Sequence, residues 1–257
     1  MSPTISIAIP TYEMKGTGPQ YLYQLFESIK NQKYKNYEVC ISDHSQNDEI
    51  LNVCGEFADN FKIQYFKNEK NRGNGPSNTN SAIEMCEGKI TKIMFQDDLF
   101  IDPWALNYII HCFDKGFSWC FNGFAHTEDG CTHSRMKVPR WTDMMLEGRN
   151  LLGSPSCVSF LTDKFVKFDE RLVLLMDTDF YHRMRYNYGM PYIISDVLTS
   201  NREHDNRVSS SSVQYDTRIE HPEGPWLVNK EELDYVLEKN KDTSCLLYTS
   251  PSPRDPH

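Results

Sequence analysis

The sequence predicts an α/β fold with a mostly parallel sheet that carries helices on both faces. Over the first 110 residues, short apolar runs alternate with longer stretches whose apolar residues recur every three or four positions. This alternation is typical of parallel sheets, because each helix that joins two strands covers one face of the sheet. The chain has 257 residues, which is enough to bury a core without disulfide or metal cross-links.

Four strands and three helices are expected in turn along this first part. Runs of apolar and β-branched residues predict strands at Ile5–Ile9, Tyr37–Ser42, Phe61–Phe66 and Lys89–Phe95. Helical spacing of apolar residues predicts helices at Tyr21–Lys30, Asp48–Phe57 and Ser77–Cys86. Pro19 supports the first helix, because proline is favoured at the start of a helix.

The pattern loosens after residue 115. Strands are expected at Phe117–Phe124 and Ser156–Leu161, and helices at Thr178–Tyr188 and Lys230–Lys239. Asp177 would be the N-cap of the helix that it precedes. The sequence also predicts an irregular segment at Pro139–Ser154, a polar mobile loop at Asn201–Ser212, and a non-native or disordered tail at Cys245–His257.

Charge and composition exclude some classes of function. Lys and Arg number 27 against 36 Asp and Glu, so the net charge is −9 and a general nucleic-acid binder is not expected. No apolar run approaches the ~18 residues of a membrane span, so no transmembrane segment is expected. The eight cysteines form no CxxC pair, which favours reduced thiols in a cytoplasmic protein.

Polar residues follow three of the predicted strands. Tyr12 comes after the first strand, Asp43 after the second, and the pair Asp97 and Asp98 after the fourth. The carboxyl ends of parallel strands meet at one edge of the sheet, where ligands bind. An aromatic ring, a hydrogen-bonding carboxylate and an acidic pair are what a nucleoside diphosphate and a divalent cation require.

Each of these residues also has a simpler interpretation. Tyr12 alone fits a half-buried surface aromatic, and Asp43 lies in a turn-forming sequence. Asp97 and Asp98 could simply end a strand. Because burial of two adjacent carboxylates without a cation is costly, the pair indicates either a metal site or a solvated sheet edge.

Five segments occur in order with a spacing that is characteristic when taken together. They are ISIAIPTYE, EVCISDHSQND, NRGNGPSNTNSAIEMCEG, KIMFQDDLFIDPWAL and FDERLVLLMDTDFYHRM. Over roughly residues 4 to 212 the chain resembles the inverting family-two glycosyltransferases of the GT-A fold. The resemblance implies a Rossmann-like, mostly parallel sheet and a smaller acceptor-side half.

The resemblance assigns roles on the donor side. Pro10 and Tyr12 would line the pocket for the base, and Asp43 would hold the base. Arg72 would contact the diphosphate. Asp97 would contact the ribose or, through water, the metal.

Three further roles follow from the same resemblance. Asp98 would be the direct metal ligand, although Gln96 replaces the first acid of the usual motif. His204 would lie near the metal or the diphosphate, or would simply be an exposed loop residue. Asp177 would be the general base, although Met176 replaces the acid that usually precedes it; the helix cap is its other interpretation.

The function implied is a metal-dependent inverting glycosyltransferase that uses Mn²⁺ or Mg²⁺. It would move a sugar from a nucleotide-diphosphate sugar, with UDP as the family default, to a hydroxyl of a glycan or lipid-linked acceptor. Residues 1–110 would bind the donor, 111–220 would bind the acceptor and catalyse, and 221–244 would hold a C-terminal helix. With this function the protein would be cytoplasmic or would associate peripherally with the inner face of the membrane. A nucleotidyltransferase and a catalytically silent nucleotide-sugar-binding module remain the alternatives.

Overall fold

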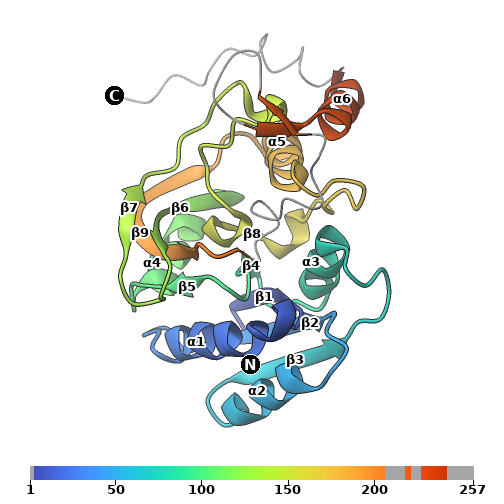
Figure 1. The fold of residues 1–257 in the computed structure, drawn as a ribbon. Helices are drawn as coiled ribbons and strands as arrows, with labels where there is room; N and C mark the ends of the chain where they lie inside the picture. Colours follow the sequence, from blue (N-terminus) through green and yellow to red (C-terminus); the bar gives the residue numbers. More distant parts are fainter. Residues whose placement is uncertain (1–2, 206–217, 221–226, 242–257) are drawn as a thin grey trace.

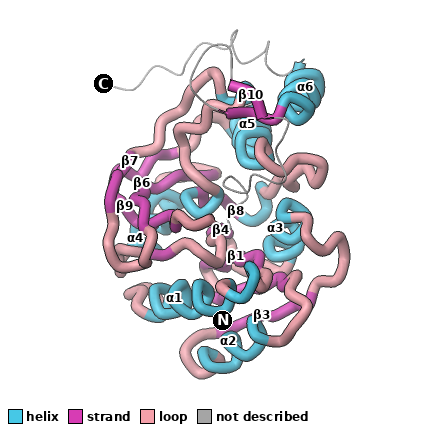
Figure 2. The backbone as a smooth tube through the Cα atoms, viewed as in Figure 1, coloured by secondary structure: helices cyan, strands magenta, loops and turns pink. Residues whose placement is uncertain are grey.

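The computed structural model describes residues 3–205, 218–220 and 227–241. In this part of the chain the strands form one nine-stranded sheet and one separate two-stranded sheet (Figures 1 and 2). The large sheet has the order β3-β2-β1-β4-β8-β6-β9-β5, with β7 paired to β6. The predicted tail at Cys245–His257 lies outside the described residues.

The four strands predicted for the first half form parallel pairs, as expected. They are β1 (Ile5–Thr11), β2 (Tyr37–Asp43), β3 (Lys62–Lys67) and β4 (Ile90–Ile93). β1 lies between β2 and β4, and all three pairings from β3 to β4 are parallel. The carboxyl ends of these strands therefore lie at the same sheet edge, which places the predicted polar clusters together.

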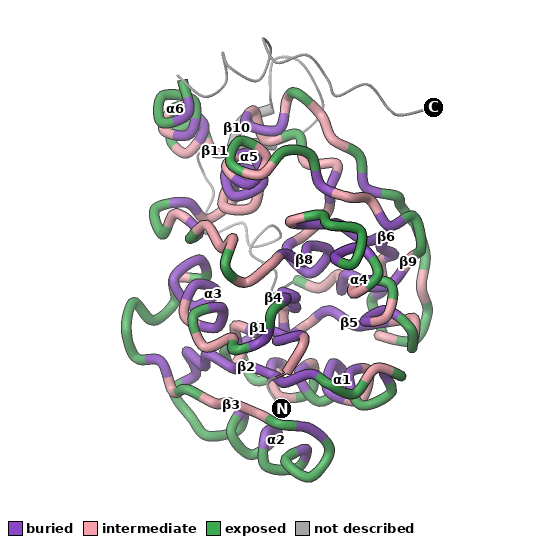
Figure 3. Tube along the Cα trace, turned by 180° about the vertical axis from the view of Figure 1, so that it is seen from behind, coloured by how far each residue is buried: buried purple, intermediate pink, exposed green. Residues whose placement is uncertain are grey.

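Helices cover both faces of this sheet, and the side chains of β1 show why. Ile5, Ile7 and Ile9 pack into a core with α1 (Gly18–Lys30) and α2 (Glu49–Phe57). Ala8 points to the opposite core, which contains α3 (Gly75–Glu84) and α5 (Met176–Tyr188). Successive residues of a strand face opposite sides, so one apolar run supplies both cores. Figure 3 shows β1 mostly buried, whereas α2 combines exposed residues with the buried Ile50, Val53, Cys54 and Phe57.

The second half extends the sheet with mixed pairing. β8 (Val158–Leu161) is antiparallel to β4 and to β6 (Trp119–Thr127). β9 (Tyr192–Arg202) runs parallel to β6, and β5 (Leu99–Phe100) and β7 (Ser134–Lys137) are short antiparallel strands. The sheet is thus continuous across the two expected halves, and the expected boundary at residue 110 falls inside α4 (Ala105–Asp114).

Two predictions for this half were wrong. The start of the loop expected at 201–212 was placed too early, because Asn201 and Arg202 are buried and end β9; residues 206–212 of that loop lie outside the described residues. Asp177 is not the cap of α5, because the helix begins at Met176 and its N-cap residue is Leu175.

The remaining elements are short turns and a C-terminal pair of strands with a helix. Short 3₁₀ turns lie at Met14–Gly16, Met145–Glu147, Pro155–Cys157 and Thr162–Lys164. β10 (Arg218–Glu220) pairs with β11 (Leu227–Asn229), which leads into α6 (Lys230–Lys239). Figure 1 shows α6 beside α5, at the end of the molecule away from α1 and α2. Within the described ranges, no helix is both long and apolar enough to span a bilayer.

Candidate active site

The Asp43 carboxylate lies at the sheet edge but points inward. Thr11 pairs with Asp43 in the register of β1 and β2, so the two strands end side by side. One carboxylate oxygen accepts from the Ser45 backbone N–H at 2.8 Å, and the other accepts from the Ser45 hydroxyl at 2.6 Å and the Tyr65 hydroxyl at 2.7 Å. The Lys67 ammonium lies 3.2 Å from the second oxygen. Burial alone would raise the pKa of Asp43, but these donors outweigh it and lower the pKa.

Two hydrogen bonds from the Gln96 side chain to the Tyr12 backbone hold Tyr12 at the same edge. The Gln96 side chain accepts from the Tyr12 N–H at 2.7 Å and donates to the Tyr12 carbonyl at 2.9 Å. The Tyr12 side chain is 41% exposed, so its ring is available to a ligand. Burial of part of the residue and the negative charges of Asp97 and Glu13 raise the pKa of Tyr12. Pro10 is partly buried in β1, opposite Ser42 of β2.

A buried histidine holds the loop that carries Arg72. The Nδ1 atom of His44 accepts from the Gly73 N–H at 3.3 Å, so its Nε2 atom donates to the Lys70 carbonyl at 3.1 Å. Arg72 is exposed on this loop, and its guanidinium lies 4.0 Å from the Glu69 carboxylate. His44 was not assigned a role from the sequence, although it lies directly after Asp43 in the motif that was singled out.

Asp97 and His204 come together although 107 positions separate them in the chain. The Nε2 atom of His204 lies 2.9 Å from a carboxylate oxygen of Asp97. The imidazole also packs against the ring of Tyr21, with 5.1 Å between the ring centroids. His204 is therefore placed at the acid pair and is not merely an exposed loop residue.

Asp98 is almost completely buried beside this pair. Its carboxylate accepts from the Arg202 backbone N–H at 2.9 Å and from the Asn201 side-chain amide at 3.0 Å. Burial, followed by the negative charge of Asp97, raises the pKa of Asp98 to about 7. A carboxylate in this state gains from a nearby cation, because a cation favours its ionised form.

Arg202 is a cation at this position that the sequence analysis missed. Its Nε atom donates to the Asp97 carbonyl at 3.0 Å, and its guanidinium lies 4.5 Å from the ring of Tyr21. The β-forming residues Tyr192, Ile193, Ile194, Val197 and Leu198 were the available signal, although Ser195 and Asp196 interrupt them: a strand that continues past Leu198 places Asn201 and Arg202 at its end.

Asp177 lies in the first turn of α5, with its carboxylate held in place. One oxygen accepts from the Thr178 N–H and the other from the Asn150 side-chain amide, both at 2.7 Å. Burial raises the pKa of Asp177 to about 6. A carboxylate with this pKa is ionised at pH 7 and is a stronger base than an ordinary aspartate.

One short segment joins Asp177 to Asp98. The Asn150 amide that contacts Asp177 also donates to the Gly153 carbonyl at 2.9 Å. The next residue, Ser154, places its hydroxyl 3.5 Å from the Asp98 carboxylate. The end of the segment expected to be irregular thus connects the two carboxylates.

Asp97, Asp98 and His204 are the side chains at this edge that could hold a divalent cation. In the part of the chain described here, no group of three or more His, Cys, Asp or Glu side chains gathers around one point. Asp97 and His204 nevertheless lie in contact, and the buried Asp98 carboxylate is adjacent in the chain. Mg²⁺ is usually held by one or two carboxylates together with water and substrate phosphates, so a small protein ligand set is sufficient.

Comparison with known proteins identifies related sequences. Residues 6–157 match the family model described as glycosyl transferase family 2. Chondroitin synthase of Escherichia coli is 33% identical over 116 residues, which are 45% of this chain and 16% of that protein. The GalNAc(5)-diNAcBac-PP-undecaprenol beta-1,3-glucosyltransferase of Campylobacter jejuni is 23% identical over 129 residues, 50% of this chain and 40% of that protein. The chain therefore spans less than half the length of these relatives.

A solved structure has the same fold. The protein is TarS 1–349 of S. aureus in complex with UDP-GlcNAc, which superposes with a TM-score of 0.65 at 17% sequence identity. The match covers 81% of this chain and 61% of that one. The expected GT-A fold is confirmed.

Proposed function

This chain belongs to glycosyl transferase family 2, and we propose that it transfers a sugar from a nucleotide-diphosphate sugar to a hydroxyl with inversion at the anomeric carbon. The observation that carries the proposal is the segment from Asn150 to Ser154, which joins the Asp177 base to the Asp98 carboxylate. UDP is the favoured nucleotide, because the fold neighbour TarS binds UDP-GlcNAc. The names of the relatives favour a glycan or lipid-linked acceptor.

In this proposal each of the site residues has a separate role. Tyr12 stacks on the base, Pro10 lines its pocket, and Arg72 approaches the diphosphate from its loop. Asp97, Asp98 and His204 would hold Mn²⁺ or Mg²⁺, which when bound would offset the charge that develops on the diphosphate leaving group. Asp177 accepts the proton of the attacking hydroxyl, while Asn150 keeps its carboxylate oriented.

The decisive experiment is to incubate the protein with a panel of nucleotide sugars and Mn²⁺ or Mg²⁺. Release of free nucleoside diphosphate with sugar transfer or hydrolysis supports the proposal. A nucleotidyltransferase would instead release no nucleoside diphosphate and, when pyrophosphate is added, would convert the nucleotide sugar to a nucleoside triphosphate and a sugar 1-phosphate. Binding of the donor without any turnover, over a panel of simple glycan acceptors, would indicate a silent binding module.

Binding of UDP is expected to depend on the metal. Mn²⁺ should raise the affinity for UDP by about 5- to 150-fold relative to EDTA, the usual range for coupling between two ligands. Asp97→Asn should remove most of this gain, because it removes the carboxylate that His204 contacts. Isothermal titration calorimetry measures both affinities, and Asp59→Asn, in the exposed turn that follows α2, is the matched control. Equal UDP affinity with Mn²⁺ and with EDTA would exclude the metal site.

Turnover is expected to fall on the acid side of about pH 6. Asp177 accepts a proton only when it is ionised, and burial raises its pKa to about 6. Turnover should therefore be level above that pH and drop about tenfold per pH unit below it. Rates of UDP release between pH 5 and 8 measure this profile. The residual activity of Asp177→Asn should not show this fall below pH 6. That result would assign the pH dependence of turnover to Asp177 and not to Asp98, the nearby carboxyl whose pKa is also raised.

A further inference from the structure

A residue of α6 holds the turn that leads into α5. The Glu232 carboxylate accepts from the backbone N–H groups of Val173, Leu174 and Leu175 at 3.0, 2.9 and 2.9 Å. These three residues precede the helix, which begins at Met176. Glu232 therefore fixes the backbone at the point where α5 begins.

The place where the helix begins decides what Asp177 contacts. An aspartate at the N-cap accepts from the N–H two or three residues later, which for Asp177 would be Asp179 or Phe180. The Asp179 N–H instead donates to the Leu175 carbonyl at 3.0 Å. Asp177 therefore lies inside the first turn, where its carboxylate accepts from the Thr178 N–H and from Asn150.

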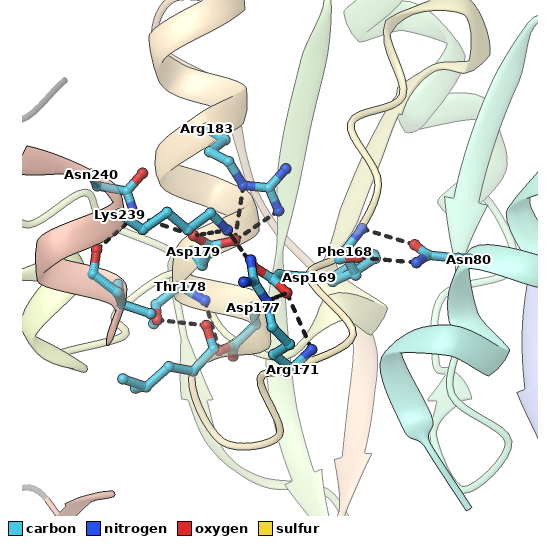
Figure 4. A network of polar contacts seen from close by, with 12 residues as sticks. Asn80, Phe168, Asp169, Arg171, Asp177, Thr178, Asp179, Arg183, Lys239 and Asn240 are labelled. Atoms are coloured by element: carbon cyan, nitrogen blue, oxygen red, sulfur yellow. Dashed lines mark hydrogen bonds and ion pairs between the residues drawn. The ribbon is translucent and has the colours of Figure 1, made fainter. Parts of the chain in front are cut away.

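Apolar and charged contacts fix α6 against this helix. Leu233 and Val236 of α6 are buried with Leu172 and Leu175, which precede α5. Figure 4 shows Lys239 of α6 reaching the buried Asp179 carboxylate, with distances of 2.9 and 3.0 Å. The helix is therefore held at both ends, by Glu232 at its first turn and by Lys239 at its last.

The Lys239 contact also offsets a charge close to the base. Asp179 is fully buried two positions after Asp177. Its carboxylate is met by the Arg183 guanidinium at 2.8 Å as well as by Lys239. An uncompensated carboxylate at this position would be costly, because burial strongly disfavours an unpaired charge. The Asp179 carboxylate is thus occupied by cations of α5 and α6, and Asp177 is the acid that contacts Asn150.

We propose that Glu232 is a positioning residue for the catalytic base, and that α6 is the element through which it acts. The proposal rests on the proposed role of Asp177. Without the Glu232 carboxylate, α5 would begin at Thr178, as its own sequence predicts. Asp177 would then cap the helix, and its carboxylate would turn away from Asn150.

The test compares Glu232→Ala with Glu231→Ala, its exposed neighbour in the first turn of α6. Hydrogen exchange of the backbone amides at 173–175 should accelerate about tenfold or more in Glu232→Ala, because these groups lose their acceptor. The kcat for UDP-glucose hydrolysis should fall about 10- to 100-fold with an unchanged donor KM, since a misplaced base costs rate and not binding. Glu231→Ala should show neither change. If Glu232→Ala does not fold, the isosteric Glu232→Gln gives a weaker form of the comparison, because it keeps one acceptor oxygen and replaces the other with an NH₂ donor.

A double-mutant cycle separates positioning from general stability. In an Asp177→Asn background, Glu232→Ala should cause no further loss of kcat, because the group it positions is already gone. An equal loss in both backgrounds, or unchanged exchange at 173–175, would overturn the positioning role. If Asp177→Asn alone retains full turnover, the base assignment fails, and the exchange measurement still decides whether Glu232 holds the start of α5.

Discussion

Asp177→Asn is expected to lower the turnover of a nucleotide sugar by about 10²–10⁴-fold, because it removes the only group placed to accept the proton in the proposed mechanism. The change is isosteric and leaves Tyr12, Asp97 and His204 untouched. The affinity for UDP should therefore stay at the wild-type value. Steady-state rates of UDP release and calorimetric titration with UDP measure the two quantities separately.

The thermal stability of this variant should stay close to that of the wild type, because two effects oppose each other. The pKa of Asp177 is about 6 in the folded protein, above the ordinary value of ~3.9. The ionised carboxylate therefore destabilises the fold increasingly as pH rises from about 4 to about 6, and asparagine removes this penalty at pH 7. Asparagine also loses one of the two acceptor contacts, with Thr178 or with Asn150.

Asp163→Asn is the control, because Asp163 is an exposed acid in the same half of the chain, paired with Lys164. Its turnover should match the wild type. Near-normal turnover in Asp177→Asn would contradict the base assignment. Asp179 could then hardly take the role, because Arg183 and Lys239 already engage its carboxylate.

The sheet that carries the donor side could be predicted because its signals are local. In β1, Ile7 and Ile9 face one core and Ala8 faces the other, which indicates a strand with two buried faces. The polar residue Tyr12 follows the end of that strand. The positions of Asp43, Asp97 and Asp98 at one edge then follow from the parallel order of the strands. The direction of the Asp43 carboxylate does not follow, since it depends on Tyr65 and Lys67 of another strand.

The second half of the chain was harder to predict, because contacts between residues far apart in the sequence decide where its helices and strands begin and end. The end of β9 reads as a polar loop, yet Asn201 and Arg202 are buried there by their contacts with Asp98. The start of α5 is likewise set by Glu232, which lies 57 to 59 positions away from its hydrogen-bond donors along the chain. A local rule, which favours Asp177 as a cap, is overridden by this tertiary contact.

Asp43→Ala is expected to destabilise the protein by about 1–3 kcal/mol, because it leaves the partly exposed Lys67 ammonium, the Tyr65 hydroxyl and Ser45 without their shared acceptor. For a chain of this size that is a fall in melting temperature of roughly 2–12 °C. The hydrogen bonds lower the pKa of Asp43, so its contribution is present above its unfolded pKa and is lost as pH falls through its folded pKa. Thermal and urea unfolding at pH 7 measure the loss, and the difference between variant and wild type should shrink in acid.

Asp48→Ala provides the matched control, because Asp48 lies 4.0 Å from the same Lys67 ammonium but is 77% exposed. Its cost should stay within about 0.5 kcal/mol, as for most surface changes. The pair of variants also decides between two roles for Asp43. If Asp43→Ala keeps its melting temperature but no longer binds UDP, the carboxylate leaves its internal partners and holds the base directly. If stability falls as expected, Asp43 is a scaffold that fixes Tyr65 and Lys67 at the sheet edge, and any loss of UDP affinity follows from their displacement.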